Sequence, residues 1–196
     1  MTEVVFGPED GLIVVDVQND FADPSGSLSV EGGEAVVAAV DRLIDAARAG
    51  GATVAYTQDW HPPDTPHFEK DGGVWPVHCV RDTWGADFHP ALTVDGEIVR
   101  KGTHGEDGYS GFTMRDPVTG DEAWTGLAEV LRAHDVTSVV VAGLATDYCV
   151  KATALDALRL GFAVTVVRDG VAAVDVQPGD GDRALAELKA AGVTLA

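Results

Sequence analysis

Basic residues are scarce in this chain of 196 residues, which has 13 Lys and Arg against 32 Asp and Glu and a formal net charge of -19. A surface this acidic would repel nucleic acid and anionic lipid, and no block of Lys and Arg offers a basic patch. We therefore expect neither a nucleic-acid partner nor a membrane partner. The excess of Asp and Glu favours solubility and is compatible with salt tolerance, but it identifies no chemistry.

Long apolar runs and cysteines are also few. No segment approaches the roughly 20 consecutive apolar residues that a membrane span requires, and residues 1–10 lack the basic and apolar regions of a signal peptide. The two cysteines, Cys79 and Cys149, are more often reduced in a chain without an export signal. A cytoplasmic enzyme is the simplest expectation.

Short β-branched runs alternate along the chain with longer segments of helical period, which is typical of a parallel sheet covered by helices on both faces. With 45% apolar residues and no repeat or linker, residues 1–196 are expected to form a single α/β domain of three layers around a six-stranded parallel sheet. The predicted strands are 12–15, 53–57, 98–100, 138–142, 163–167 and 193–195, and the predicted helices are 34–49, 124–133, 147–160 and 183–191.

The segment 58–90 is rich in proline and shows little periodicity. A connection of this length inside a compact domain is usually functional. Because ligands of open parallel sheets bind outside the carboxyl ends of the strands, we expect the chemistry of the protein at that edge.

Three polar residues stand at or just beyond predicted strand ends: Asp16, Lys101 and Cys149. A parallel sheet would bring these ends to a common edge, within hydrogen-bond reach of one another. A helix dipole and the Lys101 ammonium would favour the Cys149 thiolate, and Asp16 could accept the thiol proton and return it to a departing amide nitrogen. Each residue alone has an ordinary structural explanation, but their joint placement favours a nucleophilic site.

A second polar group follows the second predicted strand: Asp59, His61, His67 and His78. Imidazole and carboxylate ligands together suit zinc, iron or manganese. With protein ligands on one side, open positions could hold water or a substrate ring nitrogen. We expect one divalent transition metal, whose identity the residues leave open, and we interpret the adjacent Cys79 as a small buried hydrophobe.

Aromatic residues accompany these polar groups. Phe21, Trp75 and Tyr109 each lie next to one of the motifs, so they are candidates for walls that stack on a flat ring, although core packing explains any one of them equally well. The segment 143–147 precedes Cys149 at a strand-to-helix turn, where backbone N–H groups could point at a developing oxyanion.

Five motifs carry a resemblance to a known family. They are DVQNDF at 16–21, DWH at 59–61, WPVHC at 75–79, KG at 101–102 and GLATDYCV at 143–150. In this order they resemble the motifs of the nicotinamidase branch of the isochorismatase-like cysteine hydrolases, and they extend over nearly the whole chain. The segment 62–73, which carries His67, is the least distinctive.

The resemblance implies hydrolysis of nicotinamide, and also of pyrazinamide, by a triad of Asp16, Lys101 and Cys149. It implies a metal on the aspartate and the three histidines named above, with an open position for the pyridine nitrogen. An oxyanion hole would use the N–H groups of Ala145 and Cys149, after a cis peptide between Leu144 and Ala145. The implied substrate contacts are Phe21, Trp75, Tyr109, Leu144 and Ala145. The substrate is a small molecule, and the chain is a monomer or a homo-oligomer.

Two other hypotheses for the function stay open. A sister branch of cysteine amidases acts on carbamoyl compounds or other small amides with the same fold and thiol, although the metal loop argues against it. In a second alternative, Cys149 and the histidines are separate features of a metal-binding or redox protein without turnover. Release of ammonia distinguishes the three hypotheses. A metal-binding or redox protein would release none from any amide, and a sister amidase would act on carbamoyl compounds but not on nicotinamide.

Overall fold

A six-stranded parallel sheet forms the centre of the computed structural model, which describes residues 4–196. The expectation of no signal peptide partly concerns residues 1–3, which lie outside the described residues. The strand order is β3-β2-β1-β6-β7-β8, and every neighbouring pair is parallel, so the predicted sheet is confirmed. Its strands are β1 (Asp10–Val15), β2 (Thr53–Asp59), β3 (Glu97–Lys101), β6 (Ser138–Leu144), β7 (Ala163–Ala172) and β8 (Thr194–Leu195).

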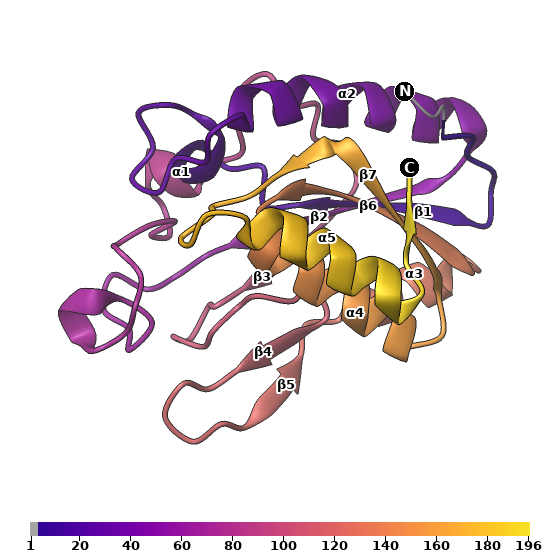
Figure 1. The fold of residues 1–196 in the computed structure, drawn as a ribbon. Coiled ribbons are helices and arrows are strands. Elements are labelled where there is room, and N and C mark those ends of the chain that lie inside the picture. Colours follow the sequence, from indigo (N-terminus) through magenta and orange to yellow (C-terminus); the bar gives the residue numbers. More distant parts are fainter. Residues whose placement is uncertain (1–3) are drawn as a thin grey trace.

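Helices cover both faces of the sheet (Figure 1). Helix α2 (Gly33–Gly50) packs on one face, and α3 (Leu127–Ala133), α4 (Lys151–Arg159) and α5 (Asp180–Ala191) pack on the other. The alternation of β1 divides its side chains between the two cores. Leu12 and Val14 belong to the core under α2, whereas Ile13 and Val15 belong to the core under the other three helices. The central strands are therefore apolar on both faces, which explains their unbroken Val-rich sequences.

Glycine marks the end of the longest helix. The N–H of Gly51, which has a left-handed φ of 76°, donates to the carbonyls of Ala47 and Arg48. This arrangement satisfies carbonyls that the last turn of a helix leaves free, and glycine adopts it without a steric penalty. The apolar stripe predicted for this helix is buried at Val36, Val40 and Ile44.

One predicted helix begins later than expected. The sequence predicted a helix over 124–133, but α3 starts at Leu127, because Gly126 has a left-handed φ of 97° that interrupts the helical path. Trp124 instead ends strand β5 (Glu122–Trp124), which pairs with β4 (Thr113–Arg115) in an antiparallel hairpin outside the main sheet. Strands this short and exposed have no hydrophobic period to reveal them.

The predicted helix 147–160 also differs in its first turn. Residues Thr146–Val150 form a π-helical turn, and the regular helix α4 follows at Lys151. A single π-turn at the start of a helix changes the direction of its side chains and is frequent at functional sites. Cys149 lies within this turn.

The long segment after β2 contains only short 3-10 turns, η1 (Glu69–Asp71) and η2 (Trp84–Ala86), and the short helix α1 (Asn19–Ala22) packs against η2.

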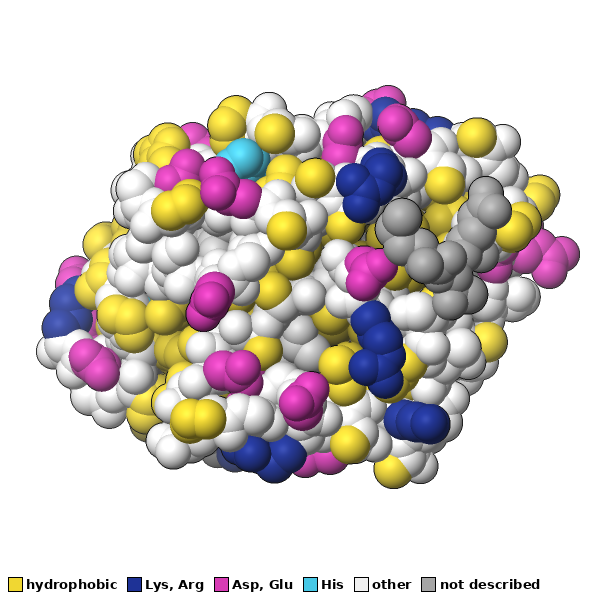
Figure 2. All heavy atoms as spheres, turned by 45° about the horizontal axis from the view of Figure 1, so that its top comes forward, with side chains coloured by type: hydrophobic (Ala, Val, Ile, Leu, Met, Phe, Trp, Pro, Cys, Tyr) yellow, Lys and Arg dark blue, Asp and Glu magenta, His cyan; other side chains and the backbone are white. Residues whose placement is uncertain are grey.

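Among the described residues, no helix is long and apolar enough to cross a membrane. On the face shown in Figure 2, acidic side chains are scattered and the few basic ones do not merge into one patch.

Candidate active site

The carboxyl ends of four adjacent strands bring together Asp16, Lys101 and Cys149. Asp16 follows β1, Lys101 ends β3, and Cys149 lies five residues beyond β6. The Lys101 ammonium lies 2.8 Å from Asp16 Oδ2 and 3.7 Å from Cys149 Sγ. All three side chains are buried. The acid, amine and thiol therefore meet at one edge of the sheet, as their positions in the sequence predicted.

Lys101 is fully buried but well paired. Its ammonium also lies 2.5 Å from Asp59 Oδ1 and donates to the carbonyl of Gly108. Burial alone would lower the pKa of Lys101, but the carboxylates of Asp16 and Asp59 hold it well above its usual value. The surroundings thus favour the charged ammonium, which balances two buried carboxylates.

The surroundings of Asp16 and Cys149 raise the pKa values of both side chains. Burial raises the pKa of Asp16 to about 6, against the opposing effect of the Lys101 ammonium. The hydroxyl of Thr57 donates to Asp16 Oδ1 at 2.7 Å and fixes the orientation of the carboxylate. Burial also raises the pKa of the Cys149 thiol well above its usual value and outweighs the Lys101 ammonium, which lowers it. The structure therefore differs from the expected thiolate: at neutral pH a neutral thiol faces an ionised carboxylate.

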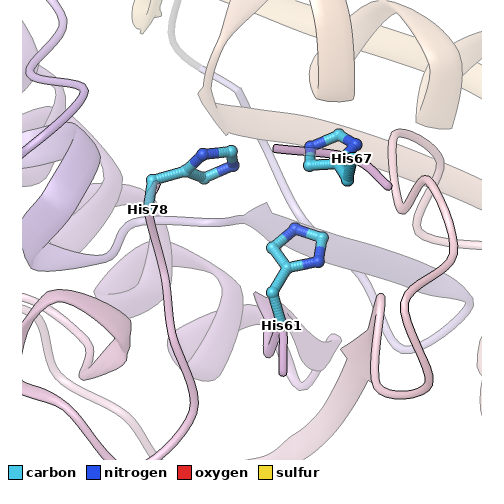
Figure 3. A group of neighbouring side chains, drawn as sticks. All are labelled: His61, His67 and His78. Carbon is cyan, nitrogen blue, oxygen red and sulfur yellow. The ribbon is translucent and has the colours of Figure 1, made fainter. Parts of the chain in front are cut away.

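A cluster of three histidines lies beside this group. His61 lies two residues beyond the end of β2, and His67 and His78 come from the loop that continues from there. Figure 3 shows the three rings converging on one point from different segments, and one nitrogen of each lies within 4.8 Å of the others. Asp59 borders the cluster, because its second oxygen, Oδ2, lies 3.9 Å from His61 Nε2.

The free nitrogens of the cluster fit a metal ion. Both ring nitrogens of His61 are buried without a hydrogen-bond partner among residues 4–196. Burial lowers the pKa of His61 to about 3, so its ring is neutral and can donate a lone pair. His67 and His78 use Nδ1 for contacts with Asp107 and the Pro76 carbonyl, which leaves Nε2 available. Buried imidazoles without partners are costly unless a ligand satisfies them.

A pocket of about 400 Å³, counted with its open mouth, joins the thiol to the histidine cluster. Cys149 lies at its surface, and Phe21, Trp75, Tyr109 and Ala145 line it. Leu144 does not line the pocket, because its side chain is fully buried in the core under α2. The full lining is Phe21, Leu28, Asp59, His67, Trp75, His78, Gly108, Tyr109, Ala145, Tyr148, Cys149 and Val174.

Three aromatic side chains make one wall of the pocket. Trp75 Nε1 donates to the hydroxyl of Tyr109 at 2.8 Å, and the ring of Trp75 meets that of Tyr148 edge to face at 4.7 Å. Burial raises the pKa of Tyr109 to about 12, so its hydroxyl stays protonated. A wall of this kind suits a flat, uncharged ring.

The turn before Cys149 approaches the neighbouring strand closely. A Cβ atom at Gly143, where φ is 127°, would lie 2.1 Å from the carbonyl oxygen of Val15, so only glycine fits there. The peptide bond between Leu144 and Ala145 is cis, as the resemblance implied. Ala145 lines the pocket next to Cys149.

Sequence reasoning missed several residues that shape the site. Gln18 forms two hydrogen bonds of 2.8 Å with the backbone of Asp59, and Thr57 contacts Asp16 as described above. Gln18 and Tyr148 lie inside the motifs at 16–21 and 143–150, so their positions in the sequence could have indicated a place at the site. Asp107 lies in a loop without periodicity, and only the fold reveals its contact with His67.

Comparisons with known proteins agree with this geometry. The model of the isochorismatase domain family matches residues 10–196. The nicotinamidase of Escherichia coli is 39% identical to this chain, over 96% of this chain and 94% of its own length.

Two solved structures are also similar. The pyrazinamidase of Pyrococcus horikoshii, determined in complex with zinc, is 42% identical, with a TM-score of 0.85 over 96% of this chain and 99% of its own. PnC1 from L. infantum, determined in complex with nicotinate, is 38% identical, with a TM-score of 0.88 over 98% of this chain and 95% of its own. The chain therefore belongs to the isochorismatase family and is similar to its nicotinamidases and pyrazinamidases.

Proposed function

We propose that the protein hydrolyses nicotinamide to nicotinate and ammonia, and that it also accepts pyrazinamide. The observation that carries the proposal is the pocket in which a buried thiol, paired with Asp16 and Lys101, lies next to three converging histidines. The names of the relatives support the same substrates. An aromatic wall suits the ring, and the thiol suits the amide carbon.

The first step is attack of Cys149 Sγ on the amide carbon. Because the thiol is neutral and the Asp16 carboxylate is the adjacent ionised base, the proton passes from sulfur to Asp16 as the carbon–sulfur bond forms. The Lys101 ammonium, 3.7 Å from the sulfur, stabilises the negative charge that develops there. The backbone N–H groups of Ala145 and Cys149 would receive the oxyanion.

Collapse of the tetrahedral intermediate expels the nitrogen. Asp16 returns its proton to this nitrogen, so that neutral ammonia leaves and a thioester remains on Cys149. Water then attacks the thioester while Asp16 takes one water proton. As the carbon–sulfur bond breaks, Asp16 passes this proton to the sulfur and restores the thiol. The acid that leaves loses its remaining proton to the released ammonia, which gives nicotinate and ammonium. Lys101 stays protonated throughout, since two carboxylates hold its charge.

The residues that would hold a divalent transition metal are Asp59, His61, His67 and His78. When bound, the ion supplies a Lewis acid for the ring nitrogen of the substrate and so helps to orient the ring. Zinc is the first ion to test, since a relative was determined with it. Within the chain itself, the Trp75 and Tyr109 wall orients the ring and excludes water from the thiol.

The test is ammonia release by the purified protein from nicotinamide, from pyrazinamide and from a carbamoyl amide. We expect release from the first two and none from the third. Cys149→Ala should abolish release without changing metal content, whereas Cys79→Ala, which removes the other free and buried thiol, should remain active. Release from the carbamoyl amide alone would assign the protein to the sister branch, and no release from any amide would refute the proposal.

A further inference from the structure

Asp107 makes a close contact with the histidine cluster. Its Oδ1 lies 2.6 Å from His67 Nδ1, and the His67 side chain is only 4% exposed whereas that of Asp107 is 21% exposed. The carboxylate therefore reaches from the margin of the protein to a ring that is buried beside the pocket.

The three histidines differ in what holds them. His78 Nδ1 contacts a backbone carbonyl, that of Pro76, at 2.8 Å. His61 has no hydrogen-bond partner among the described residues. Among the described residues, only His67 of the three has a carboxylate within hydrogen-bond distance, because Asp59 Oδ2 lies 3.9 Å from His61 Nε2. Because an ionised carboxylate only accepts hydrogen bonds, this contact favours the His67 tautomer that carries its proton on Nδ1. That tautomer leaves a lone pair on Nε2, the nitrogen free to bind an ion.

The position of Asp107 is itself fixed by the hairpin of β4 and β5. The N–H of Asp107 donates to the carbonyl of Arg115 at 2.7 Å, and its carbonyl accepts from the N–H of Arg115 at 3.0 Å. The next two residues contact the rest of the site: the Gly108 carbonyl accepts from Lys101, and the Tyr109 hydroxyl accepts from Trp75. One short segment thus connects the hairpin to three parts of the site.

We propose that Asp107 is a positioning residue for the metal centre, whose carboxylate holds His67 with Nε2 directed at the ion and thereby strengthens metal binding. The inference rests on the proposed function, in which His67 is a ligand. A carboxylate behind a metal-binding imidazole fixes the tautomer, restricts rotation of the ring and makes the free nitrogen more basic. The β4–β5 hairpin gains a role as the support of this carboxylate.

The test measures metal affinity, not turnover. Metal-free protein is titrated with zinc in competition with a chromophoric chelator, and the absorption spectrum of the cobalt-loaded protein reports the ligand geometry. Asp107→Ala should weaken zinc binding about 10- to 100-fold and alter the cobalt spectrum. Asp107→Asn keeps an acceptor but loses the charge, so its affinity should lie between those of the alanine variant and the unmodified protein.

Two further variants make the result decisive. Glu106→Gln removes the same charge from the neighbouring residue and should bind zinc normally. Among the described residues, the Glu106 carboxylate contacts only the backbone N–H and the ring of His104. His67→Ala tests the ligand itself. If His67→Ala weakens binding and Asp107→Ala does not, the positioning role is overturned while the ligand set stands. If His67→Ala binds zinc normally, the assignment of this ligand in the proposed function fails too. If Glu106→Gln and Asp107→Ala lose zinc affinity equally, the loss reflects only the removal of a nearby negative charge. That result would overturn the inference.

Discussion

Replacing Lys101 with methionine should strongly destabilise the protein. The substitution keeps a side chain of similar length but removes the only ammonium that contacts Asp16 and Asp59 among the described residues, at 2.8 and 2.5 Å. Removing one partner of a buried ion pair typically costs about 3–5 kcal/mol, because an uncompensated charge stays buried. For a chain of this size that loss lowers the melting temperature by about 6–20 °C.

The destabilisation should depend on pH. The Lys101 ammonium is the largest influence that lowers the pKa of Asp16 against burial, so its removal raises that pKa above about 6. The folded variant then binds a proton that the unfolded chain releases near pH 4. Its stability relative to the unmodified protein therefore improves as the pH falls. We expect a larger loss at pH 8 than at pH 5.

Urea unfolding followed by circular dichroism measures this loss, with chelator in every sample so that bound metal contributes equally. Lys70→Met is the matched control, since Lys70 also contacts two carboxylates, of Asp64 and Asp71, but at the surface. It should unfold like the unmodified protein, because exposed ion pairs contribute little. A loss below about 1 kcal/mol for Lys101→Met, or an equal loss at both pH values, would refute the account of the buried cluster.

Three further predictions concern activity. The value of kcat/KM should fall as the pH drops below about 6, because the ionised form of Asp16 is the base and its pKa is raised to about 6; a rate that stays constant down to pH 5 would argue against Asp16. His61→Ala should lower the metal content and raise KM, as mass spectrometry and initial rates would measure, whereas alanine at the exposed His104 should change neither. Tyr109→Phe leaves the Trp75 N–H without its acceptor, so KM should rise at least roughly 5-fold, equivalent to about 1 kcal/mol, and an unchanged KM would remove this contact from the binding wall.

Much of the fold could be predicted because its signals are local. The Val-rich strand β6 and the stripe of α2 follow from hydrophobic periodicity, and the common edge of a parallel sheet follows from the strand order they imply. Asp16, Lys101 and Cys149 could therefore be brought together before any coordinates. The β4–β5 hairpin could not be predicted, since its exposed three-residue strands are defined by pairing with each other rather than by burial.

Some residues of the site could not be placed from the sequence, because their positions also depend on the folded chain. Leu144 stands inside a motif, yet its side chain points into the core, and only the path of the turn after β6 decides this. The side chains of Asp107 and Thr57 each act through one contact with a residue about 40 positions away. Such contacts leave no periodic signal in the sequence, so they appear only when the chain is folded.

The central claim is that Cys149 carries the acyl group during turnover, and direct observation of that thioester tests it. Protein mixed with excess nicotinamide would be quenched in acid within the first turnovers, digested and mapped by mass spectrometry. We expect a nicotinoyl group on the peptide that contains Cys149 and none on the peptide that contains Cys79. Continued ammonia release by Cys149→Ala, with its metal content unchanged, would contradict the mechanism.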